Sequence, residues 1–148
     1  MASLFTRIID GEIPGHFVWT DDTCVVFLTI APITPGHALV VPRAEVDHWI
    51  DLDDDVAAHL MVVAKAIGQA QTDAFAPGRI GMIIAGLEVP HTHLHVIPIE
   101  SERDLDFAKA DGSVSQEALA ATADRLREAL VARGHAAAVQ PGSAGSSR

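Results

Sequence analysis

Apolar and polar residues follow two different periods along this chain. Short runs rich in β-branched and aromatic residues, bounded by Gly, Pro or Asp, indicate strands, and they cover residues 17–19, 24–28, 38–41 and 80–84. Two longer segments repeat apolar residues every three or four positions, as helices do. One begins near Leu52 and reaches about residue 75, and the other covers Gln116 to Ala132. The apolar positions are Val56, Leu60, Val63 and Ile67 in the first, and Leu119, Ala123, Leu126 and Leu130 in the second.

A fifth strand is predicted in an unusual run, His91-Thr92-His93-Leu94-His95-Val96-Ile97, which Pro90 and Pro98 bracket. Successive strand residues point to opposite faces, so the three histidines should share one face, with neighbouring imidazoles roughly 6 to 7 Å apart. A solvated face explains one or two histidines but three poorly, because imidazole is at once a nucleophile, a proton carrier and a metal ligand. The run therefore indicates a functional site.

Antiparallel strands with one helix between them and one after them predict an α+β fold. We expect an antiparallel sheet of about five strands, packed against a central helix and followed by a C-terminal helix. The length of 148 residues fits a single domain. That domain should span residues 1–134, because small and polar residues dominate from there and predict a flexible tail over residues 135–148. The charged stretch from Glu100 to Ser113 is expected to be a loop.

Charge and cysteine content exclude several classes of protein. Twenty acidic residues against ten basic ones leave no broad basic surface for a nucleic acid polymer, although histidines and Arg43 could favour a small anionic substrate locally. No apolar run reaches membrane-spanning length, and the first residues lack a secretion signal, so a cytoplasmic protein is expected. Cys24 is the only cysteine and lies in an apolar run. It predicts a small buried side chain, with neither a disulfide nor a thiolate metal site within the chain.

The histidine run supports two kinds of chemistry. In one, a neutral imidazole attacks phosphorus while its neighbours hold the phosphate oxygens and protonate the leaving group. In the other, the imidazoles bind a divalent metal that activates water. Three histidines on one straight strand converge poorly on a tetrahedral ion, so the metal-dependent reaction is less favoured. We expect no metal and no cofactor.

Two motifs resemble the histidine-triad (HIT) nucleotide-binding family. They are Gly36-His37-Ala38-Leu39-Val40-Val41-Pro42 and Val89-Pro90-His91-Thr92-His93-Leu94-His95-Val96-Ile97-Pro98, and the opening segment from Phe5 to Pro14 is also similar. The resemblance covers roughly residues 4 to 100. It implies a homodimeric hydrolase or transferase that acts on the α-phosphate of nucleotide phosphoramidates, adenylates or dinucleoside polyphosphates. The reaction would pass through a covalent nucleotidyl-histidine, and the small-molecule partner would be a nucleotide, with a purine base expected.

The resemblance also implies roles for single residues. His93 matches the nucleophile, His95 lies beside the scissile phosphate, and His91 and His37 orient and buffer it. An apolar base pocket, formed in the family by an amino-terminal strand region, is matched by Leu4, Phe5, Ile8, Phe27, Leu28 and Ile30. The loop that contacts the phosphate is matched by a shorter segment that contains Gly86 and Glu88.

Three departures from the family pattern keep an alternative open. Thr29 stands where many members carry an aspartate for the ribose hydroxyls, and Glu88 stands where a hydroxyl would contact the phosphate. Ser3 and Thr6 match a cysteine pair that binds structural zinc in some members, so that zinc site should be absent. The alternative is a non-catalytic nucleotide-binding or interaction protein on the same scaffold.

Overall fold

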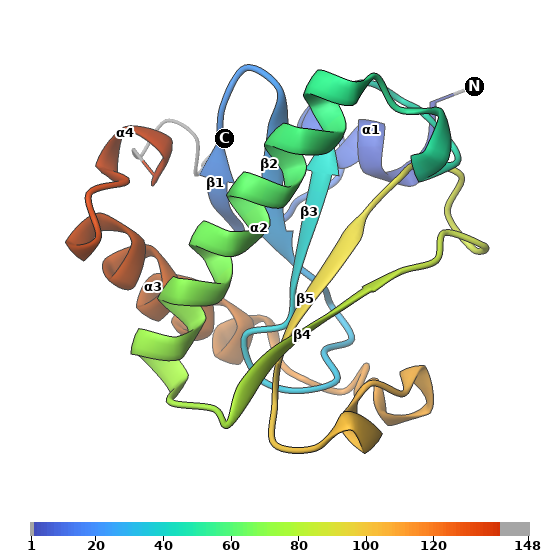
Figure 1. Cartoon of the computed structure of the whole chain (residues 1–148). Helices are drawn as coiled ribbons and strands as arrows, with labels where there is room; N and C mark the ends of the chain where they lie inside the picture. The colour runs from blue at the N-terminus through green and yellow to red at the C-terminus, as the bar shows by residue number, and fades with distance from the viewer. Residues whose placement is uncertain (1, 140–148) are drawn as a thin grey trace.

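A computed structural model describes residues 2–139 and has the predicted α+β architecture (Figure 1). Five strands form one antiparallel sheet in the order β1-β2-β3-β5-β4. The strands are β1 (Phe17–Thr20), β2 (Cys24–Leu28), β3 (Ala38–Pro42), β4 (Arg79–Ile84) and β5 (Leu94–Ile99). The α-helices are α1 (Leu4–Ile9), the central helix α2 (Asp54–Phe75), α3 (Gln116–Ala132) and α4 (Ala136–Val139).

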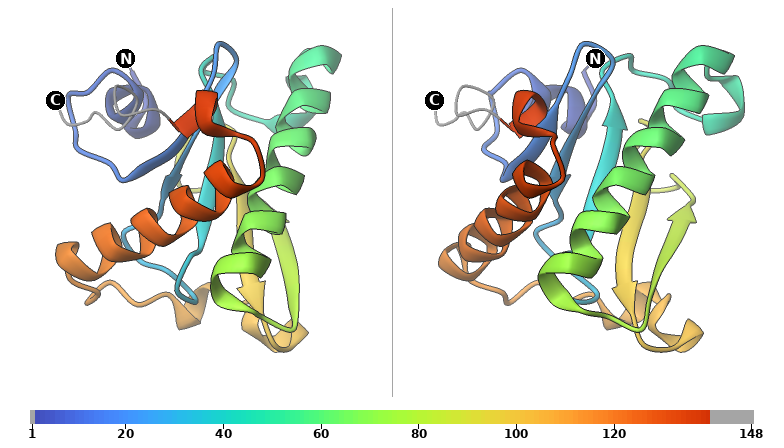
Figure 2. Two further views of the ribbon diagram at one scale, coloured as in Figure 1. Left: turned by 90° about the vertical axis from the view of Figure 1, so that its left-hand side faces the viewer. Right: turned by 60° about the vertical axis from the view of Figure 1, so that its left-hand side comes forward.

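The helices cover the two faces of the sheet unequally. Helix α2 packs against β3, β4 and β5, while α3 and α4 pack against β1 (Figure 2). These helices share one face of the sheet. Val26, Val40 and Leu94 point to that face and belong to the larger core cluster. The alternate residues Phe27 and Leu39 point to the opposite face, where they pack with the short helix α1. The face with α1 is therefore the thinly covered one.

Local sequence explains where the two long helices begin and end. Ser115 caps α3 by accepting a hydrogen bond from the backbone N–H of Ala118 at 3.0 Å. The four apolar residues predicted to share one face of this helix are all buried. Helix α2 has Asp53 at its N-cap and Asp54 and Asp55 in its first turn, where their charges favour the positive end of the helix dipole. Its last residue is Phe75, and the capping residue Ala76 adopts a left-handed conformation with φ of 49°.

The strand predicted over the histidine run begins three residues later than expected. Residues 91–93 lie outside the sheet, because the backbone N–H and the hydroxyl of Thr92 both donate to the carbonyl oxygen of Val46, each at 2.8 Å. Pro98 was expected to end the strand but lies inside β5, opposite Ile80 of the edge strand β4. Beyond Val96, β5 no longer pairs with β3, so proline is tolerated there.

One further prediction about an irregular segment is wrong. Residues 135–139 are not a flexible tail, since the ring of His135 packs 5.1 Å from that of Trp19 and Val139 is buried in the larger core. Residues 140–148 lie outside the described residues. The expected loop over residues 100–113 contains two 3-10 helices, η2 (Glu102–Asp104) and η3 (Phe107–Lys109). None of the helices within residues 2–139 combines the length and the apolar character that a membrane span requires.

Candidate active site

Four histidines meet on the sheet face that carries α1. His37 directly precedes β3, and His95 lies on the adjacent strand β5, opposite Leu39. The rings of His93 and His95 are 4.9 Å apart between centroids. This is closer than a straight strand predicts, because the backbone joins the ladder only at Leu94. The strand end thus gathers side chains that a regular strand would space out.

The hydrogen bonds of His93 determine which of its nitrogens can react. Its Nδ1 lies 2.7 Å from the backbone carbonyl oxygen of His91. A carbonyl only accepts, so Nδ1 carries the proton and Nε2 keeps its lone pair. Burial lowers the pKa of His93, and the hydrogen bond to the His91 carbonyl offsets only part of this effect. The ring is therefore neutral at physiological pH, as a nucleophile must be.

His37 and His95 form a pair whose proton positions follow from a backbone amide. The N–H of Ile33 donates to His37 Nδ1 at 3.1 Å, so the proton of His37 sits on Nε2. His37 Nε2 lies 2.9 Å from His95 Nδ1 and donates to it, which leaves the proton of His95 on Nε2. Burial lowers the pKa of His37 to about 4. The pKa of His95 falls to about 3, through burial first and then the neighbouring rings of His93 and His37.

His91 is fully buried and uses both ring nitrogens for support. Its Nε2 donates to the carbonyl oxygen of Pro42 at 2.7 Å, and its Nδ1 accepts from the Ser3 hydroxyl at 2.7 Å. Its backbone carbonyl is the acceptor for His93. His91 is therefore a positioning residue for His93.

Hydroxyls occupy the two positions that the resemblance matches to zinc-binding cysteines. The Ser3 backbone N–H and the Thr6 hydroxyl both donate to Glu45 Oε1, at 2.9 and 2.6 Å. The Ser3 hydroxyl accepts from the Thr6 N–H at 3.0 Å and donates to His91. A hydrogen-bonded cluster thus links the start of the chain to the histidine run.

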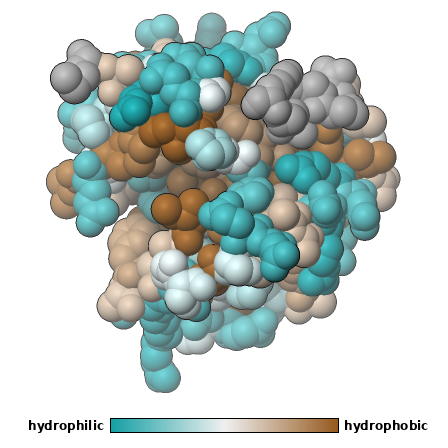
Figure 3. Space-filling model, turned by 180° about the vertical axis from the view of Figure 1, so that it is seen from behind, coloured by the Kyte–Doolittle hydropathy of each residue, from teal (hydrophilic) through white to brown (hydrophobic). Residues whose placement is uncertain are grey.

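An apolar surface adjoins His93. The Phe5 ring contacts His93 edge to face at a centroid distance of 4.8 Å and Phe27 at 5.6 Å, and Ile8 is buried in the same cluster. Seen from behind, apolar surface gathers in a hollow across this side of the molecule (Figure 3). The segment that carries Phe5 and Ile8 is helix α1, not a strand, because the Ser3 side chain caps it.

Of the other three predicted base-pocket residues, Leu28 lies away from this surface. Leu28 points to the opposite face of the sheet and packs in the larger core. Its position next to Phe27 on a strand requires this. Leu4 and Ile30 are 45% and 68% exposed.

Thr29, Gly86 and Glu88 lie in loops. The Thr29 hydroxyl accepts from the backbone N–H of Ala31 at 3.2 Å, so it caps a local turn. Gly86 has a φ of +90°, which favours glycine, and Glu88 is exposed between β4 and His91. The Glu88 side chain thus has room to turn away from an anion.

Two residues that sequence reasoning missed contact this site. The ring of Phe107, in η3, packs 4.9 Å from that of His95, and it is 46% exposed. Gln71, on α2, is fully buried, and its Nε2 donates to the carbonyl oxygens of Gly36 and Val96, both at 2.9 Å. Neither residue belongs to a motif, and only the fold brings them to the histidine pair.

Comparisons with known proteins agree with this geometry. The family model for the HIT domain matches residues 10–102. An uncharacterized HIT-like protein of Saccharolobus solfataricus is 34% identical over 111 residues, which are 72% of this chain and 79% of that protein. The adenosine 5'-monophosphoramidase of Schizosaccharomyces pombe is 31% identical over 107 residues, 69% of this chain and 77% of that enzyme.

Solved structures match the same fold. A zinc-bound histidine triad family protein from Mycobacterium smegmatis superposes with a TM-score of 0.78 at 25% identity, over 92% of this chain and 98% of that one. A hypothetical histidine triad nucleotide-binding protein from Sulfolobus tokodaii gives a TM-score of 0.77 at 26% identity, over 86% and 91% of the two chains.

Proposed function

Because this chain belongs to the HIT domain family, we propose that it cleaves nucleotide conjugates at the α-phosphate through a nucleotidyl group held on His93. The bond from His93 Nδ1 to the His91 carbonyl carries the proposal, since it leaves the lone pair of Nε2 free to attack. The likeness to an adenosine 5'-monophosphoramidase supports a phosphoramidate as the substrate.

The first step is the attack of His93 Nε2 on phosphorus, while the bond from phosphorus to the leaving nitrogen or oxygen breaks. Positive charge develops on the ring, and the bond from Nδ1–H to the buried His91 carbonyl stabilises it. Within residues 2–139, no protein acceptor takes the Nε2–H of His95. This N–H can donate a hydrogen bond to a phosphate oxygen or to the leaving atom. The proton that the leaving atom gains comes from water.

The second step restores the free enzyme. Water attacks phosphorus, the bond from His93 Nε2 to phosphorus breaks, and the proton of the water passes to solvent. Phe5 and Phe27 offer aromatic edges and faces beside His93, which suit a purine base. With the Thr29 hydroxyl bonded to Ala31, we expect the ribose to be held more weakly than by a carboxylate.

The test uses adenosine 5'-monophosphoramidate with the wild type and with His93→Ala. The wild type should turn it over, and intact-mass analysis after denaturation at alkaline pH should detect an adenylylated chain. His93→Ala should show neither turnover nor adduct. His48→Ala is the matched control, because His48 is exposed and lies outside the site. Turnover by His93→Ala at the wild-type rate would refute the mechanism.

The experiment also separates the alternative, a nucleotide-binding protein without catalysis. The presence of Thr29 favours that alternative, since one hydroxyl that already accepts from Ala31 cannot hold the ribose as a bidentate carboxylate would. Tight binding of purine nucleotides by the wild type, with no turnover and no adduct, would establish it.

We also propose a homodimer. Strand β4 is an edge strand, and Leu87, in the loop that follows it, is 97% exposed. Ile50 is a second exposed apolar side chain that a dimer interface could cover, with 62% of its surface exposed. Light scattering should then give twice the chain mass of 15.7 kDa.

A further inference from the structure

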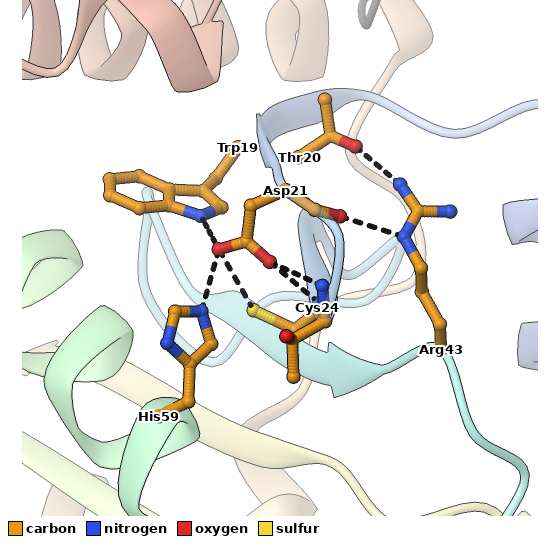
Figure 4. Close-up of polar contacts among 7 residues, drawn as sticks. Trp19, Thr20, Asp21, Cys24, Arg43 and His59 are labelled. Carbon is orange, nitrogen blue, oxygen red and sulfur yellow. Dashed lines mark hydrogen bonds and ion pairs between the residues drawn. The ribbon is translucent and has the colours of Figure 1, made fainter. Parts of the chain in front are cut away.

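A second cluster of reactive side chains lies where the β1–β2 turn meets α2. Asp21 belongs to the turn, Cys24 begins β2, and His59 projects from α2 (Figure 4). One ligand atom from each lies within 4.8 Å of the other two. His59 Nε2 is 2.7 Å and Cys24 Sγ is 3.8 Å from the same oxygen, Asp21 Oδ2. Cys24 belongs to the core on the α2 face, so this cluster is separate from the active site.

The three side chains match what a divalent zinc ion prefers. Zinc in proteins takes thiolate, imidazole and carboxylate ligands in a tetrahedron. With bonds of about 2.0–2.3 Å, neighbouring ligand atoms would lie about 3.3–3.6 Å apart. The distance of 3.8 Å from Cys24 Sγ to Asp21 Oδ2 is already close to this value, and the distance of 2.7 Å from His59 Nε2 to Asp21 Oδ2 would open by about 0.6 Å.

Charge balance favours a divalent ion in this buried place. Cys24 is 0% exposed, and burial first, with Asp21 beside it, strongly raises the pKa of its thiol. A thiolate and a carboxylate together carry two negative charges, which one Zn²⁺ neutralises. Binding would release one proton from the thiol, while the imidazole would keep one proton, moved from Nε2 to Nδ1.

The carboxylate is already fixed toward the cluster. Asp21 Oδ1 accepts from the backbone N–H groups of Thr23 and Cys24, both at 2.8 Å, and Oδ2 accepts from Trp19 Nε1 at 2.8 Å. Burial alone would raise the pKa of Asp21, but these bonds and that from His59 outweigh it and lower the pKa to about 2. The carboxylate is thus ionised at neutral pH.

The turn that carries this carboxylate is itself held in place. Arg43 bonds to the Asp21 carbonyl oxygen at 2.7 Å and to the Thr20 hydroxyl at 2.6 Å. Supporting bonds of this kind orient metal ligands in known sites. The side chains of Asp21 and His59 are 25% and 37% exposed, which leaves a route for an ion.

We propose that Asp21, Cys24 and His59 bind Zn²⁺ with water as the fourth ligand, and that the ion fastens the β1–β2 turn to α2. Because the sequence has one cysteine, it predicts no thiolate metal site. One thiolate is enough, however, when an aspartate and a histidine supply the other protein ligands. The proposal does not depend on the reaction proposed for His93.

Cobalt(II) titration tests this directly, because the chain has a single cysteine. A sulfur-to-cobalt charge-transfer band can therefore come only from Cys24. We expect one equivalent of Co²⁺ to produce the band, added Zn²⁺ to remove it, and Cys24→Ala to lack it. His59→Gln, at a half-exposed position that spares the fold, should weaken binding at least tenfold, and His48→Gln should leave it unchanged.

Thermal melting supplies a second readout. Zn²⁺ should raise the Tm of the wild type and raise that of His59→Gln less at the same Zn²⁺ concentration, since a ligand of the folded state stabilises it by mass action. Cobalt binding without the sulfur band, or a band equally strong in His59→Gln, would overturn the proposal.

Discussion

Replacement of Gln71 by methionine tests how the fold positions the histidine pair. Gln71 Nε2 donates to the carbonyl oxygens of Gly36 and Val96, which lie next to His37 and His95 in the sequence. The side chain is 0% exposed, so Gln71→Met removes a buried side-chain donor from both carbonyls. Among the described residues Gln71 Oε1 has no donor, so its removal costs no bond to the protein.

The magnitude follows from those two carbonyls. Each buried carbonyl that loses its donor costs about 1–3 kcal/mol, so the free energy of unfolding should fall by roughly 2–6 kcal/mol. A domain of this size is stable by about 5–15 kcal/mol, so the variant should still fold. A small shift between β3 and β5 would lengthen the bond from His37 to His95, so kcat should fall by roughly ten- to a hundredfold.

Urea denaturation and steady-state kinetics measure the two effects. Gln69→Met is the matched control, because Gln69 lies on the same helix and is half-buried. A loss below about 0.5 kcal/mol in Gln71→Met, or a loss equal to that of Gln69→Met, would show that the carbonyls find other partners.

Three other changes have defined outcomes. Ser3→Ala leaves His91 Nδ1 without its donor, so the free energy of unfolding should fall by about 1–3 kcal/mol in a urea melt. Because the pKa values of His37 and His95 lie near 4 and 3 in the folded state, the unfolded chain binds more protons below about pH 6.5. Stability should therefore fall from pH 6.5 toward pH 4, and less steeply in His37→Gln. Phe107→Ala should lower kcat/KM up to about tenfold for phosphoramidates with aromatic leaving groups, and less for the unsubstituted amide.

The spacing of apolar residues predicted most of the helices and strands, because burial of one face of each element determines that spacing. Helix α3 has the predicted bounds of Gln116 and Ala132, since a polar cap and a regular apolar face agree there. The start of β5 could not be predicted in this way. Thr92 is a good strand former, but Val46, 46 residues earlier, takes its backbone N–H. Periodicity also gave no sign of helix α1, whose six residues are too few for a repeat.

The site was predicted in part, through the histidines and their motifs. Phe5 came from the resemblance and its ring contacts His93, and Ile8 packs in the same apolar cluster as Phe5, whereas Leu28 was assigned without regard to strand alternation. Contacts between distant segments gave no sequence signal. Gln71 contacts the histidine strands from α2, and His59 reaches Asp21 across 38 residues.

The amide of Ile33 has a consequence for tolerance to mutation. The Ile33 N–H determines which ring nitrogen of His37 carries the proton, and through His37 which ring nitrogen of His95 carries it. The Ile33 side chain does not contribute. Many amino acids could therefore replace isoleucine at position 33 with little change in which nitrogens carry protons. Proline is the exception, because it has no N–H to donate. The protonation pattern of the histidine pair is thus encoded in the path of the backbone, where point substitutions seldom reach it.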